Sequence, residues 1–332
     1  MSPVSAPAIS IIVPAYNAAG TIRKCLDALL ATLGPQSEIV VVDDGSTDDT
    51  AALAEATGAR VLRLAGNQGP GAARNHGARA ARGAVLLFVD SDVAVAPDAI
   101  VRAHRALAET DAAAVFGSYD DRPEAPGLVS QFRNLLHHWV HQHASREAFT
   151  FWAGLGAMRR SVFEAAGGFD ERGPAAVLED VELGHRVCAA GHRIVLDPGM
   201  QGSHLKRWTL GSMIRTDLLH RAIPWGRLLL AGGPIERDLN LTMGQRASVA
   251  LTGVIGGALV LAIWWPRLLA VAAGALGVII LLNRDFYDFL ARARGAVFAL
   301  ASIPVHLVHF ACGGAGFAYV WVERRVGMLR RR

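Results

Sequence analysis

Short apolar runs that alternate with helical patterns are the feature that most constrains the fold of this chain. Each run is rich in Val, Ile, Leu or Phe, and its length suits a strand buried on both faces of a parallel sheet. Strands that alternate with helices of this length predict βαβ units, and therefore an α/β fold with a mostly parallel sheet. The expected strands are residues 9–13, 38–42, 60–64 and 85–89, and the expected helices are residues 18–33, 47–57 and 69–82.

Beyond residue 92 the alternation becomes less regular. The patterns predict a strand at residues 113–117 and helices at residues 97–110, 128–143 and 181–190. The middle helix carries four histidines, at positions 137, 138, 141 and 143. No Cys or carboxylate joins them at metal-ligand spacing, so a polar, partly exposed helix face is favoured over a metal site.

Charge divides the chain into an acidic front and a basic back. Residues 1–204 have a net charge of −6 and residues 205–332 a net charge of +10, which together give the overall +4. The basic part is also apolar, which favours an anionic membrane surface over nucleic acid as its partner. The three cysteines lack metal-ligand spacing and fit a reducing compartment. The first ten residues lack the pattern of a signal peptide, so the front part is expected in the cytosol.

The back part predicts attachment to a membrane. Residues 206–247 mix Trp and Leu with Arg, as an interfacial helix does, although a helix packed on the front domain has the same composition. Two nearly charge-free runs, residues 249–265 and 268–282, together predict a tight transmembrane hairpin. A third run, residues 296–322, is interrupted by Pro and Gly. Three spans would place the Arg-rich tail outside, so two spans plus a re-entrant or interfacial third segment are favoured.

Acidic residues follow two of the predicted strands at their ends. D-S-D stands at residues 90–92 and D-D-G-S at residues 43–46. Because the carboxyl ends of parallel strands meet at one edge of a sheet, where ligands bind, these residues are expected to lie together. Two carboxylates one residue apart suit Mg²⁺ or Mn²⁺ carrying a diphosphate. A D-x-D triplet alone is more typical of a solvated strand end, and the other motifs of the chain favour the metal site.

Six short motifs occur in a specific order along the front part. They are V-P-A-Y-N (13–17), V-V-D-D-G-S-T-D-D-T (41–50), N-Q-G-P-G-A-A-R-N-H-G (67–77), D-S-D (90–92), G-G-F-D-E (167–171) and L-E-D-V-E-L (178–183). With these motifs, about the first 205 residues of the chain resemble a family 2 glycosyltransferase. The resemblance implies the Rossmann-like GT-A fold and an inverting, metal-dependent transfer of a sugar from a nucleotide-sugar.

The same resemblance implies which residues bind the donor. Pro14, Tyr16, Asp43 and Asp44 are expected to cradle the nucleotide, with Tyr16 against the base and Asp44 accepting a hydrogen bond from a base N–H. Arg74, in a helix after a Gly-rich loop, is expected to face the nucleotide or the diphosphate. An ordinary Asp-Gly-Ser turn and a solvent-exposed helical Arg are the alternatives.

The resemblance also implies a metal ligand in the D-S-D triplet and a catalytic base in the Glu179-Asp180 pair. Asp92 is expected to coordinate Mn²⁺ or Mg²⁺, with Asp90 contacting the ribose or a water and Ser91 lying between them in the same site. In the pair Glu179-Asp180, Asp180 corresponds to the catalytic base of the family, which removes a proton from the acceptor. Acidic residues at a helix start are also what a plain capping preference gives.

H-x-x-R-W at residues 204–208 differs from the Q-x-x-R-W of processive family members. A neutral imidazole is a suitable ligand for Mn²⁺, so His204 is expected beside Asp92 as a further metal ligand; a purely structural histidine is the alternative. The difference favours an enzyme that transfers a single sugar.

These observations predict a membrane-attached hexosyltransferase of cell-envelope glycolipid synthesis, with residues 1–205 as catalytic domain, 206–247 as interfacial segment and 248–332 as membrane region. The donor is expected to be a UDP-sugar, with GDP-mannose next. The acceptor is lipid-linked or membrane-proximal, at the cytosolic side of the inner membrane. Four arginines could hold a lipid phosphate: Arg207, Arg215, Arg221 and Arg227. A non-catalytic membrane module is the alternative function; a dinucleotide oxidoreductase is disfavoured because G-x-G-x-x-G does not follow the first strand.

Overall fold

The computed structural model describes residues 8–171, 178–230 and 242–329. It contains two compact units. Unit 1 comprises Met1–Glu124 and His141–Lys206, and unit 2 comprises Ala125–Val140 and Arg207–Arg332. Two parts of the predicted back region, residues 231–241 and 330–332, lie outside the described residues.

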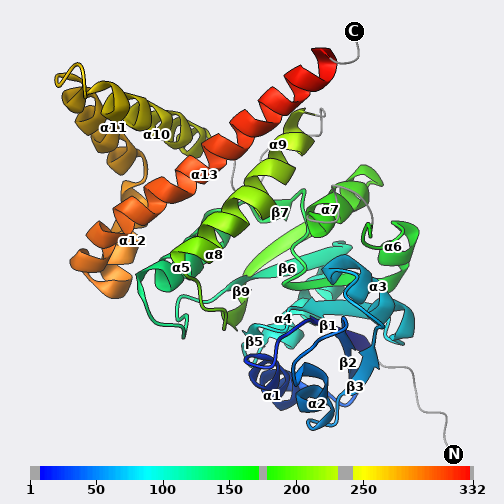
Figure 1. The fold of residues 1–332 in the computed structure, drawn as a ribbon. Helices are drawn as coiled ribbons and strands as arrows, with labels where there is room; N and C mark the ends of the chain where they lie inside the picture. Colours follow the sequence, from blue (N-terminus) through cyan, green and yellow to red (C-terminus); the bar gives the residue numbers. More distant parts are fainter. Residues whose placement is uncertain (1–7, 172–177, 231–241, 330–332) are drawn as a thin grey trace, which may run out of the picture. The chain divides into compact units, whose positions relative to one another are not determined.

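One mixed sheet of nine described strands forms the centre of unit 1 (Figure 1). Its order is β3-β2-β1-β4-β8-β6-β9-β5, with β7 also pairing with β9. Strands β1 to β4 are parallel, β6 and β9 are parallel to each other, and β8 joins the two groups as an antiparallel strand between β4 and β6. The strands are β1 (Ile9–Ala15), β2 (Ser37–Asp43), β3 (Arg60–Arg63), β4 (Val85–Val89), β5 (Val93–Val95), β6 (Ala114–Tyr119), β7 (Glu147–Ala148), β8 (Leu155–Arg159) and β9 (Ile194–His204).

The helices of unit 1 follow the predicted alternation through α4. Pro70 stands in the first turn of α3, and Gly69 before it has a φ of 93°, a conformation that favours glycine. A Cβ on Gly77 would lie 2.5 Å from Ile12 Cγ2, so this glycine lets α3 lie directly on β1. The helices are α1 (Ile22–Thr32), α2 (Thr50–Glu55), α3 (Pro70–Ala80), α4 (Ala99–Glu109), α6 (Arg160–Ala165) and α7 (Glu179–Ala189).

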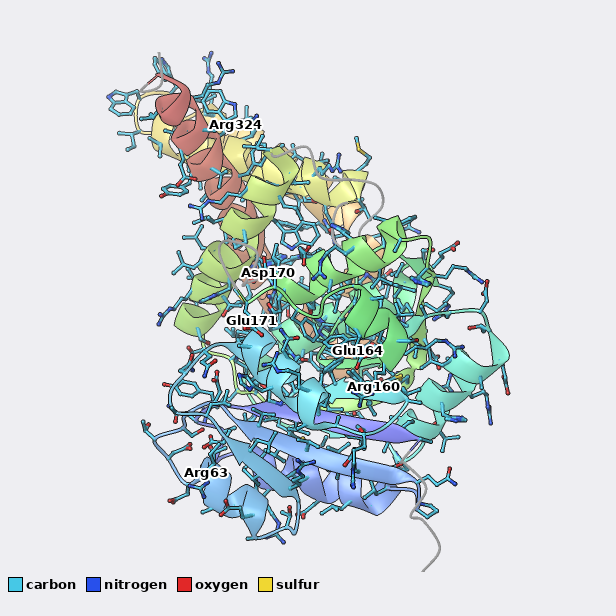
Figure 2. All side chains as sticks on the ribbon, turned by 90° about the vertical axis from the view of Figure 1, so that its right-hand side faces the viewer. Arg63, Arg160, Glu164, Asp170, Glu171 and Arg324 are labelled. Carbon is cyan, nitrogen blue, oxygen red and sulfur yellow. The ribbon has the colours of Figure 1, made fainter. Side chains whose placement is uncertain are left out.

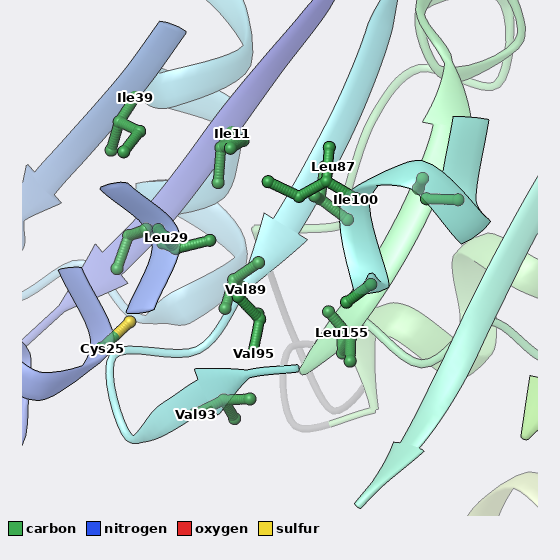
Figure 3. Packing of buried hydrophobic residues seen from close by; sticks show 14 of the residues in the cluster. Ile11, Cys25, Leu29, Ile39, Leu87, Val89, Val93, Val95, Ile100 and Leu155 are labelled. Carbon is green, nitrogen blue, oxygen red and sulfur yellow. The ribbon is translucent and has the colours of Figure 1, made fainter. Parts of the chain in front are cut away.

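Apolar residues from the sheet and from α1 and α4 form the largest core cluster. Exposed charged residues such as Arg63 and Glu164 lie on the surface of unit 1 (Figure 2). Inside, Ile11, Leu29 and Leu87 are completely buried (Figure 3). Burying a side chain of this size contributes about 1.5–3 kcal/mol. The apolar runs at residues 9–13, 38–42 and 85–89 therefore form largely buried strands as predicted, whereas β3, from the run at residues 60–64, is only partly buried.

Helix α5 (Leu128–His143) begins in unit 2 and ends in unit 1. The expectation of a polar, partly exposed histidine face holds only in part. His143 is exposed, but His141 is buried and its Nδ1 lies 2.9 Å from the carbonyl oxygen of Gly117. A buried imidazole with a backbone partner supports the packing of this helix end.

Unit 2 consists of helices. A cluster from α5, α8, α12 and α13 forms its core, with Phe132, Leu135, Phe286 and Leu290 as central members. The run at residues 296–322 forms one helix through Pro304 instead of breaking there. The helices are α8 (Leu210–Arg215), the π-helix η2 (Thr216–Ala222), α9 (Ile223–Leu230), α10 (Met243–Leu261), α11 (Leu268–Leu282), α12 (Arg284–Arg294) and α13 (Ala296–Leu329).

Two described helices are long and apolar enough to cross a membrane: Met243–Leu261 and Ala296–Val326. The helix pair α11 and α12 also passes this test when taken together, but it is bent by 71° at the break. Side chains such as Trp264 and Trp265, which are 65% and 61% exposed, are typical of an interface between membrane and water. The number of spans and the side of the tail stay predictions.

Replacing Gly77 by Ala tests how closely α3 lies on β1. The new Cβ overlaps Ile12 and approaches Val42 Cγ2 to 3.1 Å. Overpacking of this kind costs about 1–3 kcal/mol, and the better helix propensity of Ala offsets about 1 kcal/mol of it. We expect a lower midpoint in urea unfolding of the detergent-purified protein. Gly20→Ala is the control, because no atom lies within 4 Å of its added Cβ; an unchanged midpoint in both variants contradicts the close contact.

Candidate active site

The D-S-D triplet lies in the turn between β4 and β5, and hydrogen bonds fix its backbone. Asp90 N–H donates to the carbonyl of Gly154 at 3.1 Å, and Val93 N–H donates to the carbonyl of Asp90 at 2.9 Å. The thiol of Cys25 lies 3.5 Å from the same Asp90 oxygen. Side chains of this turn, including Ser91, are partly exposed at the carboxyl edge of β4.

Pairing of β5 with β9 brings His204 beside the triplet. His204 stands opposite Val93 in the ladder, and Leu205 N–H donates to the carbonyl of Asp92 at 2.8 Å. As a result, His204 Nε2 lies 3.4 Å from Asp92 Oδ2. The imidazole stacks on the ring of Tyr119, with 4.2 Å between centroids and 7° between planes. The two predicted metal ligands are therefore neighbours.

Carboxylate and imidazole are compatible with Mn²⁺ or Mg²⁺, but they offer only two protein ligands. Among the described residues no group of three or more His, Cys, Asp or Glu side chains is arranged to hold a metal ion. A cation here therefore needs oxygens from a bound diphosphate or water. Burial tends to raise the pKa of Asp92, but the hydrogen bond and charge of His204 hold that pKa below its usual value. Asp92 is thus ionised at neutral pH, as a ligand must be.

Arg74 joins the two acidic motifs. Its side chain is 6% exposed, Nη2 lies 2.7 Å from Asp90 Oδ1, and Nη1 lies 2.6 Å from Glu179 Oε1. The guanidinium carbon lies 5.5 Å from the ring centroid of Phe169. Burial alone lowers the pKa of Arg74, but Asp90 and Glu179 raise that pKa above its usual value. The alternative of a solvent-exposed helical Arg is wrong, since Arg74 is buried as a bridge between carboxylates.

Asp180 lies in the first turn of α7, and its carboxylate is held by backbone hydrogen bonds. Its Oδ2 accepts a hydrogen bond from Ala153 N–H at 3.2 Å, and its Oδ1 accepts one from Val181 N–H at 2.8 Å. Burial and the negative charge of Glu179 raise the pKa of Asp180 to about 7, although Arg74 acts to lower that pKa. A carboxylate with a pKa near the working pH is well suited to proton transfer. Glu179, in contrast, is held by its ion pair.

Asp44 is buried and attached to the Gly-rich loop. Its Oδ1 accepts a hydrogen bond from Gln68 N–H at 2.8 Å and its Oδ2 one from Gly69 N–H at 2.9 Å. Burial raises the pKa of Asp44 against these hydrogen bonds. Asp43 Oδ1 accepts from Ser46 N–H at 3.2 Å, as expected for a turn. Each Asp44 oxygen has a second lone pair, so a further donor can still be accepted.

The turn after β1 is tied to the turn after β2, and this leaves Tyr16 at the surface. Asn17, with a φ of 48°, donates from its N–H to Ser46 Oγ at 3.0 Å and accepts from Thr47 N–H at 2.9 Å. Tyr16 is 48% exposed, whereas Pro14 is buried in the strand. An exposed aromatic ring beside Asp44 suits contact with a planar base.

Sequence reasoning missed the segment before β8, residues 150–154. Ala153 N–H binds Asp180 and the Gly154 carbonyl binds Asp90 N–H, so this segment connects both acidic motifs. A Cβ on Gly154 would lie 2.6 Å from the ring of Trp152, which itself packs edge-to-face on Tyr119 at 4.9 Å. The signal was present in the sequence, because W-A-G-L-G places two glycines after a Trp just ahead of an apolar run.

Comparison with known proteins supports the fold. The structure superposes on that of the mannosyltransferase PcManGT from Pyrobaculum calidifontis, solved with GDP-Man and Mn²⁺, with a TM-score of 0.58 and 22% identity, covering 94% of this chain and 88% of that one. The likeness shows the fold, and the protein is thus an α/β protein of the GT-A class. Residues 10–167 match the model of glycosyl transferase family 2. The match covers slightly less than half of the chain and supports a domain of this family at residues 10–167.

Curated relatives match stretches of this chain. The succinoglycan biosynthesis protein ExoO of Rhizobium meliloti (strain 1021) is 44% identical over 110 residues, which are 32% of this chain and 31% of that protein. An uncharacterized glycosyltransferase, EpsJ of Bacillus subtilis (strain 168), is 33% identical over 175 residues, 48% of this chain and 50% of that protein. The chain thus spans half or less of the length of these relatives.

Replacing Arg74 by Met tests the bridge. Asp90 and Glu179 then lose their common cation, and breaking a buried ion pair in this way costs about 3–5 kcal/mol. We expect thermal unfolding at a clearly lower temperature at pH 7.5, with a smaller difference at pH 5, because burial raises the pKa of Asp90 and this carboxyl takes up a proton more readily as the pH falls. Arg79→Met on the same helix is the control, because Arg79 is 59% exposed and 3.7 Å from its partner; an equal, small effect in both variants contradicts a buried bridge.

Proposed function

We propose that this protein is a membrane-attached inverting glycosyltransferase that moves one sugar from a nucleotide-sugar to a lipid-linked or membrane-proximal acceptor. One observation carries the proposal. Asp180, a carboxylate with a pKa of about 7, is linked by Glu179 and Arg74 to the D-S-D triplet beside His204. A base and a diphosphate site are the two parts that this reaction needs.

In the proposed transfer reaction, Asp180 acts as the base. The Asp180 carboxylate takes the proton of an acceptor hydroxyl, and the acceptor oxygen forms a bond to the anomeric carbon of the donor sugar. The bond from that carbon to the diphosphate oxygen breaks, and the nucleoside diphosphate leaves. Because attack and departure occur on opposite faces, the anomeric configuration inverts. Arg74 holds Asp90 and Glu179 in its ion pairs, so Asp180 is the carboxylate proposed to take the acceptor proton.

Asp92 and His204 would hold Mn²⁺ or Mg²⁺, which neutralises charge on the departing diphosphate when bound. Tyr119 supports this role by keeping the imidazole plane fixed through stacking. Asp90 and Ser91 lie next to Asp92 and are proposed to contact the donor ribose or a water. The geometry is compatible with either cation.

The donor base is proposed to lie against Tyr16 and to donate an N–H to Asp44, with Asp43 and Pro14 shaping the turn around it. A UDP-sugar is the first candidate, since it is the default donor of the family. GDP-mannose is the second, because the similar solved mannosyltransferase contains GDP-Man. We propose Asp44 as the residue that reads the base, because its buried carboxylate has a fixed direction.

The acceptor is proposed to be presented by a membrane. Two described helices can cross a bilayer, and α8 with η2 exposes Leu210, Ile214 and Leu219 next to the exposed Arg207 and Arg215. An apolar stripe beside arginines suits the boundary between acyl chains and anionic headgroups. The proposed location is the cytosolic side of the inner membrane, where the arginines could hold a lipid phosphate.

Donor binding and turnover by the detergent-purified protein test the proposal. We expect one UDP- or GDP-sugar to bind and to release its nucleotide in the presence of Mn²⁺. Asp180→Asn is expected to keep the donor affinity and to lose turnover at least 100-fold, because a general base contributes about 10²–10⁴-fold. Asp92→Asn is expected to raise the Mn²⁺ concentration needed. A folded protein that binds no nucleotide-sugar would support the non-catalytic membrane module instead.

The pKa of Asp180 predicts the pH dependence. Only the ionised carboxylate accepts a proton, so kcat/KM is expected to rise about tenfold per pH unit below about pH 7 and to level off above it. Glu179→Gln removes the negative charge that raises this pKa, and the acid limb is then expected at lower pH. Rates of the wild-type protein that do not vary between pH 5 and 8 contradict Asp180 as the base.

A further inference from the structure

Asn75 makes an unusual set of contacts that the proposed reaction does not use. It lies on α3, is 6% exposed, and faces the loop at residues 167–171. Its Nδ2 donates to the carbonyl of Phe169 at 2.8 Å, and its Oδ1 accepts from the N–H of the same residue at 2.9 Å. Nδ2 also lies 2.8 Å from Glu171 Oε1. The side-chain amide thus pairs with one residue's backbone as a neighbouring strand would.

Two glycines make this close contact possible. Gly168 has a φ of 73°, and a Cβ there would lie 2.7 Å from Asn75 Oδ1. Gly71, one turn earlier on α3, would bring a Cβ to 3.2 Å from Glu179 Cγ and 3.3 Å from the carbonyl oxygen of Asp170. Figure 2 labels Asp170 and Glu171 in this loop. The helix therefore lies against the loop and against the first residue of α7 at once.

One face of α3 carries all of these contacts. Gly71, Arg74 and Asn75 are spaced three and four residues apart, so they point to the same side of the helix. Arg74 binds the carboxylates of both acidic motifs, and Asn75 binds the loop. Phe169 connects the two, because its backbone is held by Asn75 and its ring lies 5.5 Å from the Arg74 guanidinium.

Phe169 also reaches the sheet. Its ring packs edge-to-face on Phe88 of β4, with 5.1 Å between centroids, two residues before the D-S-D triplet. A shift of Phe169 therefore changes the support of Arg74 and, through it, of Asp90 and Glu179. From the other side, Arg186 of α7 donates to the carbonyl of Gly168 at 2.6 Å. The loop is held between α3 and α7.

We propose that Asn75 is a positioning residue of the transfer reaction: by clamping Phe169 against α3, it sets the place of Arg74 and of the Glu179-Asp180 pair relative to the D-S-D triplet. The proposal rests on the proposed function, because it assigns Asp180 as the base. A displacement of about 1 Å at a reacting group can lower a rate about 100-fold. Donor binding at Tyr16 and Asp44 uses other elements and is expected to be unaffected.

Asn75→Leu tests the proposal, since Leu keeps most of the volume and removes the three hydrogen bonds without adding charge. We expect a donor Kd within about twofold of wild type and a kcat lowered about 10- to 100-fold. The acid limb of kcat/KM is expected to move to lower pH, because looser packing lets water reach Asp180 and weakens the burial that raises its pKa, with Glu179, Arg74 and Asp90 still around it. A purely structural role lowers the folded fraction but leaves this limb in place.

Two further variants make the result specific. Gly168→Ala disturbs the same contact from the loop side, so it is expected to shift the acid limb in the same direction. Because both changes act on one contact, the kcat of the double variant is expected to be no lower than that of the less active single variant. Arg79→Ala is the matched control. It removes an exposed ion pair to Glu171, 3.7 Å long, and leaves both hydrogen bonds between Asn75 and the Phe169 backbone intact; kcat and the acid limb are expected to equal those of wild type.

Hydrogen exchange gives a readout that does not need activity. The peptide containing Phe169 is expected to exchange faster in Asn75→Leu than in wild type, because its N–H loses its acceptor. Faster exchange together with an unchanged kcat and acid limb overturns the positioning role, and unchanged exchange overturns the clamp itself. If the wild-type protein transfers no sugar, the proposed function fails; wild-type turnover with unaffected variants rejects the role of Asn75 alone.

Discussion

The buried guanidinium of Arg74 is the interaction on which the site depends. Burial and like charge together raise the pKa of Asp90, with Arg74 opposing them, and the same balance brings the pKa of Asp180 to about 7. One cation shared between Asp90 and Glu179 holds the two motifs close together. Without Arg74 the burial that raises the pKa of Asp90 and of Asp180 would be opposed less, and a second cation would lower the pKa of Asp180 further. The site therefore needs one buried arginine among three acidic groups.

How far the sequence predicts the fold depends on the pattern of each strand. Strands β1, β2 and β4 are continuous apolar runs, and the local sequence pattern alone predicts them. Strand β9 contains Asp197, Pro198 and Gly199 and alternates buried with half-buried residues, and β5 is three residues long, so neither has a clear signal. Their pairing places His204 beside Asp92. That proximity came from the resemblance to a family and could not come from periodicity.

The candidate site shows the same division. Carboxylates at strand ends and at a helix start are visible in the sequence, and Asp92, Asp44 and Asp180 lie at the sheet edge and the helix start as predicted. The partners of Arg74, 16 and 105 residues away, are set by packing that local patterns do not contain. Asn75 is a second example. An Asn within a helix predicts no particular contact, and its role is visible only once the loop that it binds is placed against α3.

Unit 2 also contains a buried arginine that is paired with a carboxylate. Arg133 of α5 lies 2.6 Å from Asp217 of η2, whose other oxygen lies 2.7 Å from His309 of α13. Burial tends to raise the pKa of Asp217, but His309 and Arg133 hold it below its usual value. Buried ion pairs add little net stability but can fix the register of helices. The π-helix serves this arrangement, since its wider turn points Asp217 inward while Leu219 stays exposed. The polar groups of this cluster are thus buried, whereas Leu219 of the same π-helix is exposed.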